Sequence, residues 1–204
     1  MATTSFTAKD VQELRQRTGA GMMDCRNALQ ETGGDIEKAI DLLRKKGHAK
    51  AEKRVGRSAK EGLIASYIHH NGKVGVLVEV NCETDFVART DDFKQLVRSI
   101  AEHIAAGVPS VALAVTKDQV SADVVERERA IFADQAAASG KPENIVQKMV
   151  DGRVDKFYKE VALMEQPWVR DDSRTIGDLV KDATAKTGEN IVIRRFSRFQ
   201  MGEE

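Results

Sequence analysis

Hydrophobic positions in the first 46 residues recur every three or four places, which is the spacing of one helix face. Glycine-rich breaks at 18–21 and 32–34 divide this stretch into three parts, and glycine commonly ends helices. Asp35 can cap the third part. The pattern predicts three short helices in a small bundle, with these apolar positions: Val11, Leu14, Met22, Met23, Leu29, Ile36, Ala39, Ile40 and Leu43.

The pattern then changes to strand-like apolar runs at 63–68 and 74–80. Between them lies His70-Asn71-Gly72-Lys73, and Asn-Gly favours a two-residue primed turn in which both central residues have positive φ. These runs predict a β-hairpin. A further apolar run at 191–196 can join it as a third strand.

Helical spacing returns after the hairpin. A helix is expected to carry Phe93 and Ile104 on one face and to end at Gly107. Residues 111–115 fit either a loop or a short strand. Helices expected from Ser121 to about Ser139 and from Pro142 to about 161 are joined by Ser139-Gly140-Lys141, so they should pack as an antiparallel hairpin. One more helix is expected over 176–186.

Together these elements predict an α+β fold with an antiparallel three-stranded sheet, helices and an inserted helical hairpin. The predicted domain boundaries place a three-helix unit at 1–46, a basic linker at 47–60, an α+β core at 61–118 and 164–204, and the hairpin insertion at 119–163.

The overall charge is balanced. The 204 residues include 32 basic and 32 acidic side chains and are 41% hydrophobic, which excludes a polycation and an acidic disordered protein. No apolar run approaches the roughly 18 residues of a membrane span. The start, MATTSFTAKD, shows no signal peptide, and two cysteines are too few for a disulfide scaffold. We therefore expect a cytoplasmic protein that needs no membrane.

Residues 44–60 are locally basic, with eight lysines and arginines against Glu52 alone. One interpretation is a linker or solvated helix extension, and the other is contact with RNA phosphates. The first is favoured because no aromatic side chain interleaves the charges to stack on bases, so no specific nucleic acid is expected.

Catalytic patterns are scarce. The four histidines lack metal-ligand spacing, and no phosphate-binding glycine motif is present. Cys82 is conceivable as a nucleophile, but no histidine neighbours it, and a half-buried structural role is favoured. We predict no catalytic residue, no metal site and no cofactor, although a zinc- or thiol-dependent enzyme remains a third class to weigh.

The segment 79–89 runs from a strand directly into a short polar turn. Thr84 can cap a helix there, Asp85 suits a helix N-terminus, and Phe86 then falls in the first turn. Phe86 precedes Phe93 by seven residues, so periodicity favours a core position. The alternative is an exposed ring that anchors a partner.

Two long motifs in this chain closely resemble the translation elongation factor Ts family: LRQRTGAGMMDCRNAL at 14–29 and EVNCETDFVAR at 79–89. The resemblance continues in order through three shorter runs and so covers nearly the whole chain: SGKP at 139–142, KMVDGR at 148–153 and QPWV at 166–169. Arg26 stands where the family usually has lysine, which keeps the charge.

The resemblance implies a guanine-nucleotide exchange factor for elongation factor Tu, which would be bound in its GDP-bound and nucleotide-free states without covalent chemistry. It implies that the turn formed by Thr84, Asp85, Phe86 and Val87 intrudes near the partner's Mg²⁺ site, which reverses the periodicity-based interpretation of Phe86.

The same resemblance makes the N-terminal unit ubiquitin-associated-like and assigns it to partner binding through Leu14, Met22 and Met23. It relates the helical hairpin to a coiled-coil module. Longer family members have two related core subdomains, whereas this chain has room for one, so it is similar to the short form and is expected to form a homodimer through the core sheet.

Overall fold

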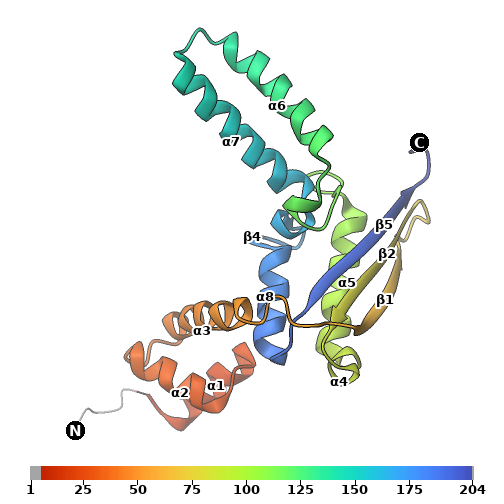
Figure 1. The fold of residues 1–204 in the computed structure, drawn as a ribbon. Helices are drawn as coiled ribbons and strands as arrows, with labels where there is room; N and C mark the ends of the chain where they lie inside the picture. Colours follow the sequence, from red (N-terminus) through yellow and green to blue (C-terminus); the bar gives the residue numbers. More distant parts are fainter. Residues whose placement is uncertain (1–5, 204) are drawn as a thin grey trace.

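The computed structural model of this protein describes residues 6–203. The first five residues of the predicted N-terminal domain and Glu204 of the predicted core lie outside this range. Figure 1 shows a three-helix unit beside an α+β core, and a long helical hairpin that projects from the opposite end of that core. Within the described range, each helix is too short or too polar to cross a membrane.

The N-terminal unit consists of α1 (Ala8–Thr18), α2 (Met22–Glu31) and α3 (Ile36–Glu52), in the predicted order. Its core is small and contains Val11, Leu14, Cys25, Ala28, Leu29 and Ala39. Helix α3 continues six residues into the predicted linker. Tertiary packing explains the extension, because α3 lies against α8 (Ile176–Thr187), where a Cβ on Gly47 would stand 3.0 Å from the Cβ of Ala185.

The sheet contains β1 (Glu61–Ile68), β2 (Val74–Cys82) and β5 (Val192–Gln200), all antiparallel and in the order β1-β2-β5. Ala65 pairs with Val78, and Val78 pairs in turn with Phe196. The predicted third strand is therefore confirmed, and it runs four residues further than expected. Alternate residues of β2 point into the core, and on the opposite face of the sheet Ile64, Ile68 and Leu77 are exposed in the described structure.

The β1–β2 hairpin is confirmed, but the predicted primed turn is wrong. Only Gly72 of the Asn-Gly pair has positive φ, at 68°. The N–H of His69 donates to the Val74 carbonyl over 2.9 Å, so four residues form the connection rather than two. The Gly72 N–H closes a turn on the His69 carbonyl at 2.7 Å, and the Asn71 side chain accepts from the Lys73 N–H. This local side-chain bond stabilises the longer connection.

Helix α5 (Asp91–Ala106) lies across the inner face of the sheet, and α8 packs beside it (Figure 1). Phe93 and Ile100 of α5 are almost fully buried against Val78 and Val80 of β2. Gly107 ends α5 in the left-handed conformation, as predicted. Apolar burial of this kind is the dominant stabilising contribution in such a layer.

The projecting hairpin is formed by α6 (Ala122–Ala137) and α7 (Glu143–Val161), which pack antiparallel as predicted (Figure 1). The ambiguous 111–115 segment forms a loop with one isolated bridge, from Ala114 to Ala162. Short 3-10 turns, η1 (Lys117–Gln119) and η2 (Leu163–Glu165), flank the hairpin. A small ribbon, β3 (Pro167–Trp168) with β4 (Asp171–Thr175), was not predicted because its polar residues do not alternate with apolar ones.

A buried network fastens the base of this hairpin to α5. The Nε2 atom of His103 lies 3.0 Å from Oε1 of Gln166, and its Nδ1 accepts from the Val169 N–H at 3.2 Å. The Gln166 amide donates to the carbonyls of Ser110 and Glu160. The imidazole therefore serves as donor and acceptor together, which requires the neutral ring.

Burial lowers the pKa of His103, although its hydrogen bond to Gln166 acts in the opposite direction. In an unfolded chain, histidine has a pKa of about 6.5. Below that pH the unfolded chain binds more protons than the folded one, so stability present above pH 6.5 is lost as the pH falls toward the lower folded pKa. We expect the melting temperature of the wild type to fall more steeply between pH 8 and pH 5.5 than that of His103→Gln. Equal slopes for the two proteins would contradict this expectation.

Candidate functional site

A short corner joins the end of β2 to the first helix of the core. Strand β2 ends at Cys82, and α4 (Asp85–Ala88) begins three residues later with Thr84 as its N-cap. The Thr84 hydroxyl accepts the Val87 N–H at 3.4 Å, so the predicted cap is present. We call residues 83–88 the β2–α4 corner.

Phe86 is 79% exposed on this corner. Its expected core position, inferred from the seven-residue spacing to Phe93, is wrong. Thr90 starts a new helix there, with extended ψ of 147° and its hydroxyl accepting the Phe93 N–H at 3.3 Å. Because the two phenylalanines lie on separate helices, the spacing does not place them on one face. The ring is exposed, as the family resemblance implies.

The other corner residues divide between outward and inward positions. Asp85 is partly exposed, and its carboxylate pairs with Arg89 at 2.7 Å. Val87 packs partly against the core, and Ala88 is buried. The corner therefore presents one apolar ring and one carboxylate outward while its inner side is anchored.

Glu189, in the loop between α8 and β5, is the contact residue that the sequence pattern did not reveal. One carboxylate oxygen accepts the N–H groups of Glu83 at 3.1 Å and Thr84 at 3.0 Å, and the other accepts the Thr84 hydroxyl at 2.6 Å. More than 100 positions separate these residues in the chain, so local spacing carries no signal for the contact.

Cys82 is fully buried beneath the corner, and its Sγ contacts the Thr84 carbonyl at 3.1 Å. Burial raises the pKa of the Cys82 thiol, and the nearby Glu189 charge raises it further. Burial also raises the pKa of Cys25. Thiols held in the protonated form are poor nucleophiles, which disfavours a thiol enzyme. Among residues 6–203 no group of three potential metal-binding side chains is clustered.

The N-terminal unit presents a second candidate contact surface at the start of α2. Met22 is 47% exposed and Met23 is 63% exposed. Leu14, in contrast, has no exposed surface and lies within the core of its own unit. The assignment of Leu14 as a direct partner contact is therefore corrected: its side chain holds α1 against α2 and α3.

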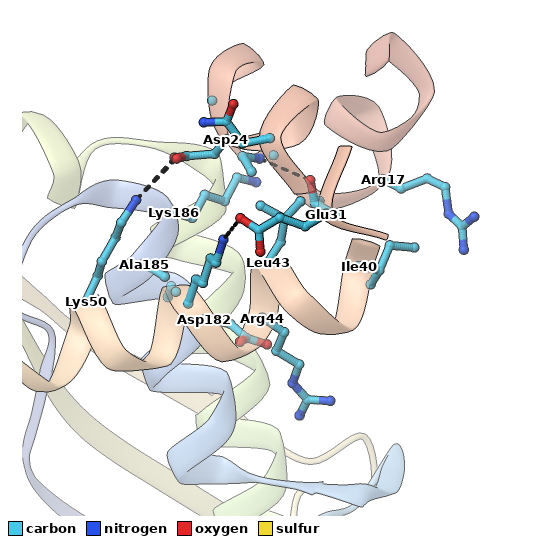
Figure 2. Close-up of a pocket in the computed structure, with 18 of the residues that line it drawn as sticks. Arg17, Asp24, Glu31, Ile40, Leu43, Arg44, Lys50, Asp182, Ala185 and Lys186 are labelled. Atoms are coloured by element: carbon cyan, nitrogen blue, oxygen red, sulfur yellow. Dashed lines mark hydrogen bonds and ion pairs between the residues drawn. The ribbon is translucent and has the colours of Figure 1, made fainter. Parts of the chain in front are cut away.

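A cleft of about 820 Å³ separates α1 and α2 from α8, at the junction of the N-terminal unit with the core (Figure 2). Its walls are strongly charged, but every lysine and arginine lining it already pairs with a carboxylate. The pairs are Arg17–Glu37, Arg44–Asp178, Lys46–Glu31, Lys50–Asp24, Arg174–Asp182 and Lys186–Asp92. The cleft is thus a charged junction between the two units rather than a binding site for an anion.

The same pairing bears on the basic stretch 44–60. Four of its cations contact carboxylates on other elements: Arg44, Lys46, Lys50 and Arg57. Lysine and arginine side chains that pair with carboxylates of this chain are less available to RNA phosphates, so these contacts do not support the nucleic-acid alternative.

Comparisons with known proteins point to one family. The family described as "Elongation factor TS" matches residues 3–203. Elongation factor Ts from Fervidobacterium nodosum is 56% identical over 198 residues, which cover 97% of this chain and 99% of that protein. The corresponding protein from Syntrophobacter fumaroxidans is 54% identical over 99% of this chain and all of its own length.

Proposed function

This chain belongs to the elongation factor Ts family, and on that premise we propose that it promotes release of GDP from elongation factor Tu so that GTP can bind. It would act in the cytoplasm, by binding and without covalent chemistry. The observation that carries the proposal is the outward presentation of Phe86 and Asp85 on an anchored corner.

We assign the β2–α4 corner the role of a wedge. An apolar ring this exposed gains free energy when a partner's apolar gap covers it, about 1.5–3 kcal/mol for full burial. The neighbouring Asp85 carboxylate would act on the surroundings of the partner's magnesium ion. Mg²⁺ demands near-ideal octahedral geometry, so small displacements of its ligands weaken its binding.

We assign the start of α2 the role of a clamp. Met22 and Met23 offer flexible apolar contact area, and methionine adapts well to irregular partner surfaces. An exchange factor must bind the nucleotide-free partner more tightly than the GDP-bound partner. By linkage, GDP then weakens the factor's binding by the same amount that the factor weakens GDP binding.

The direct test is release of labelled GDP from elongation factor Tu with and without this chain. We expect the release rate to rise with chain concentration and then to saturate. A rate that stays at the intrinsic value at every concentration would refute the proposal.

We also propose that two copies associate through the outer face of the core sheet. Ile64 and Ile68 of β1, Leu77 of β2 and Phe199 of β5 are all exposed on this face. The strand pairing sets Ile68, Gly75 and Phe199 in one row across the sheet. The Glu79–Arg195 ion pair, 2.7 Å long, interrupts this face, but exposed apolar side chains grouped in this way are typical of an interaction surface.

Leu77→Arg is expected to separate such a dimer into monomers, because it places a new charge among the exposed apolar side chains of the central strand. Sedimentation at micromolar concentration should give the mass of two chains for the wild type and of one chain for the variant. Val55→Arg is the matched control, since Val55 is exposed outside the sheet. A wild-type mass of one chain would refute the proposed dimer.

A further inference from the structure

The β2–α4 corner cannot be held in place by its own secondary structure. Helix α4 has four residues, a single turn. Isolated helices shorter than about 12–15 residues are marginal in water, so a single turn depends on contacts from outside. Its exposed position also gives Phe86 no packing that would fix the corner from the outer side.

Val87 and Ala88 supply part of this support by packing against the core, and Glu189, near the end of the chain, supports the residues that precede α4. Its carboxylate accepts all three donors of Glu83 and Thr84 that face it: two backbone N–H groups and one hydroxyl. Hydrogen bonds to a charged acceptor are about twice as strong as neutral ones. A single side chain therefore fixes the two residues from which α4 begins.

The contact is reciprocal, because each of the two segments, 83–84 and 189–190, both donates to and accepts from the other. The Asn190 N–H donates to the Glu83 carboxylate at 2.7 Å, while Glu189 accepts from the Glu83 N–H. The buried Asn190 amide also donates to the Arg57 carbonyl at 2.8 Å, which ties in the segment leading to β1. The start of β5, the end of β2 and the chain after α3 thus meet at one point.

Glu189 also connects the corner with the N-terminal unit, because it directly follows the C-cap of α8. Helix α8 carries the contacts to α3. Asp182 lies 2.6 Å from Nε2 of His48, and Lys181 lies 3.5 Å from Glu52. Helix α8 therefore contacts α3 of the N-terminal unit, and the loop that follows α8 contacts the β2–α4 corner through Glu189. Figure 1 shows the N-terminal unit and α4 at the same end of the core, away from the α6–α7 hairpin.

We propose that Glu189 is a positioning residue for nucleotide exchange: it holds the β2–α4 corner so that Phe86 and Asp85 meet the partner already ordered. This inference rests on the proposed exchange function. It follows from preorganisation, because a loosened corner would have to be ordered during the exchange step itself. The clamp contacts on α2 do not depend on Glu189, so initial binding should be preserved.

The test measures GDP release from elongation factor Tu over a range of chain concentrations, which separates the half-saturating concentration from the saturating rate. Glu189→Ala is expected to lower the saturating rate about tenfold and to leave the half-saturating concentration within about twofold. Tenfold in rate corresponds to about 1.4 kcal/mol. Glu165→Ala is the matched control, since Glu165 is a partly exposed carboxylate that pairs with Lys117 near the hairpin base.

Conservative variants separate positioning from charge. In Glu189→Gln the amide oxygen can still accept the two backbone N–H groups and the amide nitrogen can donate to Thr84, so most of the rate should return. Glu189→Asp keeps the charge but is shorter by one methylene, so it should lose part of the rate. If Glu189→Ala unfolds below the assay temperature, Glu189→Asp replaces it in the test. A lower saturating rate with an unchanged half-saturating concentration then supports the proposal, and a wild-type rate overturns it.

A double-mutant cycle with Phe86→Ala tests whether Glu189 acts through the corner. If it does, removing Glu189 in the Phe86→Ala background should lower the rate by clearly less than the tenfold seen in the wild-type background, because only the positioning of Asp85 is then left to lose. An equal loss in both backgrounds, or a Glu189→Ala variant at the wild-type rate, overturns this inference. A wild-type chain that never accelerates GDP release would instead overturn the proposed function itself.

Discussion

Phe86→Ala is expected to slow saturated GDP release at least tenfold while the protein remains as stable as the wild type. The ring is 79% exposed, so its removal leaves no cavity, and surface substitutions usually change the free energy of unfolding by less than about 0.5 kcal/mol. Its contribution is therefore expected only in the complex, where the ring would enter an apolar gap. GDP release kinetics and a thermal melt of the same preparation measure both quantities.

Val55→Ala is the matched control for this substitution, because Val55 is comparably exposed but lies in the segment after α3. It should exchange nucleotide at the wild-type rate. A Phe86→Ala protein that unfolds would show that the ring supports its own fold. A folded variant with undiminished exchange would show that the ring is not the wedge.

The double substitution Met22→Ala and Met23→Ala is expected to raise the half-saturating concentration about tenfold or more and to leave the saturating rate nearly unchanged. Both side chains are exposed at the start of α2, and alanine is as good a helix former as methionine, so α2 should persist. The loss is confined to contact area with the partner. Titration of the exchange rate against chain concentration measures it.

Magnitudes explain why Phe86 alone is not enough. Accelerating release by about 10⁴ requires lowering the barrier by roughly 5.4 kcal/mol. Burial of one phenylalanine contributes about 1.5–3 kcal/mol, which leaves a remainder for Asp85, while the clamp holds the partner in place. If the methionine variant lost saturating rate and kept its half-saturating concentration, the division into clamp and wedge would be wrong.

Local sequence signals predicted those parts of the fold that local chemistry determines. The bounds of α2 follow from glycines on both sides, and the end of α5 follows from Gly107. The predicted turn type was wrong because Asn-Gly alone does not fix the loop length. The observed four-residue connection includes a hydrogen bond that the Lys73 N–H donates to the Asn71 side chain.

The candidate site was less predictable, because its geometry depends on contacts between distant segments. Periodicity placed Phe86 in the core, since it could not detect that Thr90 starts a separate helix. The exposed ring was anticipated only from the family resemblance. Glu189 was not predicted, because the three groups that donate hydrogen bonds to it lie more than 100 positions earlier in the sequence, and only folding brings them together.

We propose that the corner weakens the partner's hold on magnesium, and GDP release measured with and without that metal tests this most directly. We predict that this chain accelerates release strongly when Mg²⁺ is present. When a chelator has removed the metal, intrinsic release should already be fast and the further acceleration should be several-fold smaller. An acceleration of equal size in both conditions would contradict the claim.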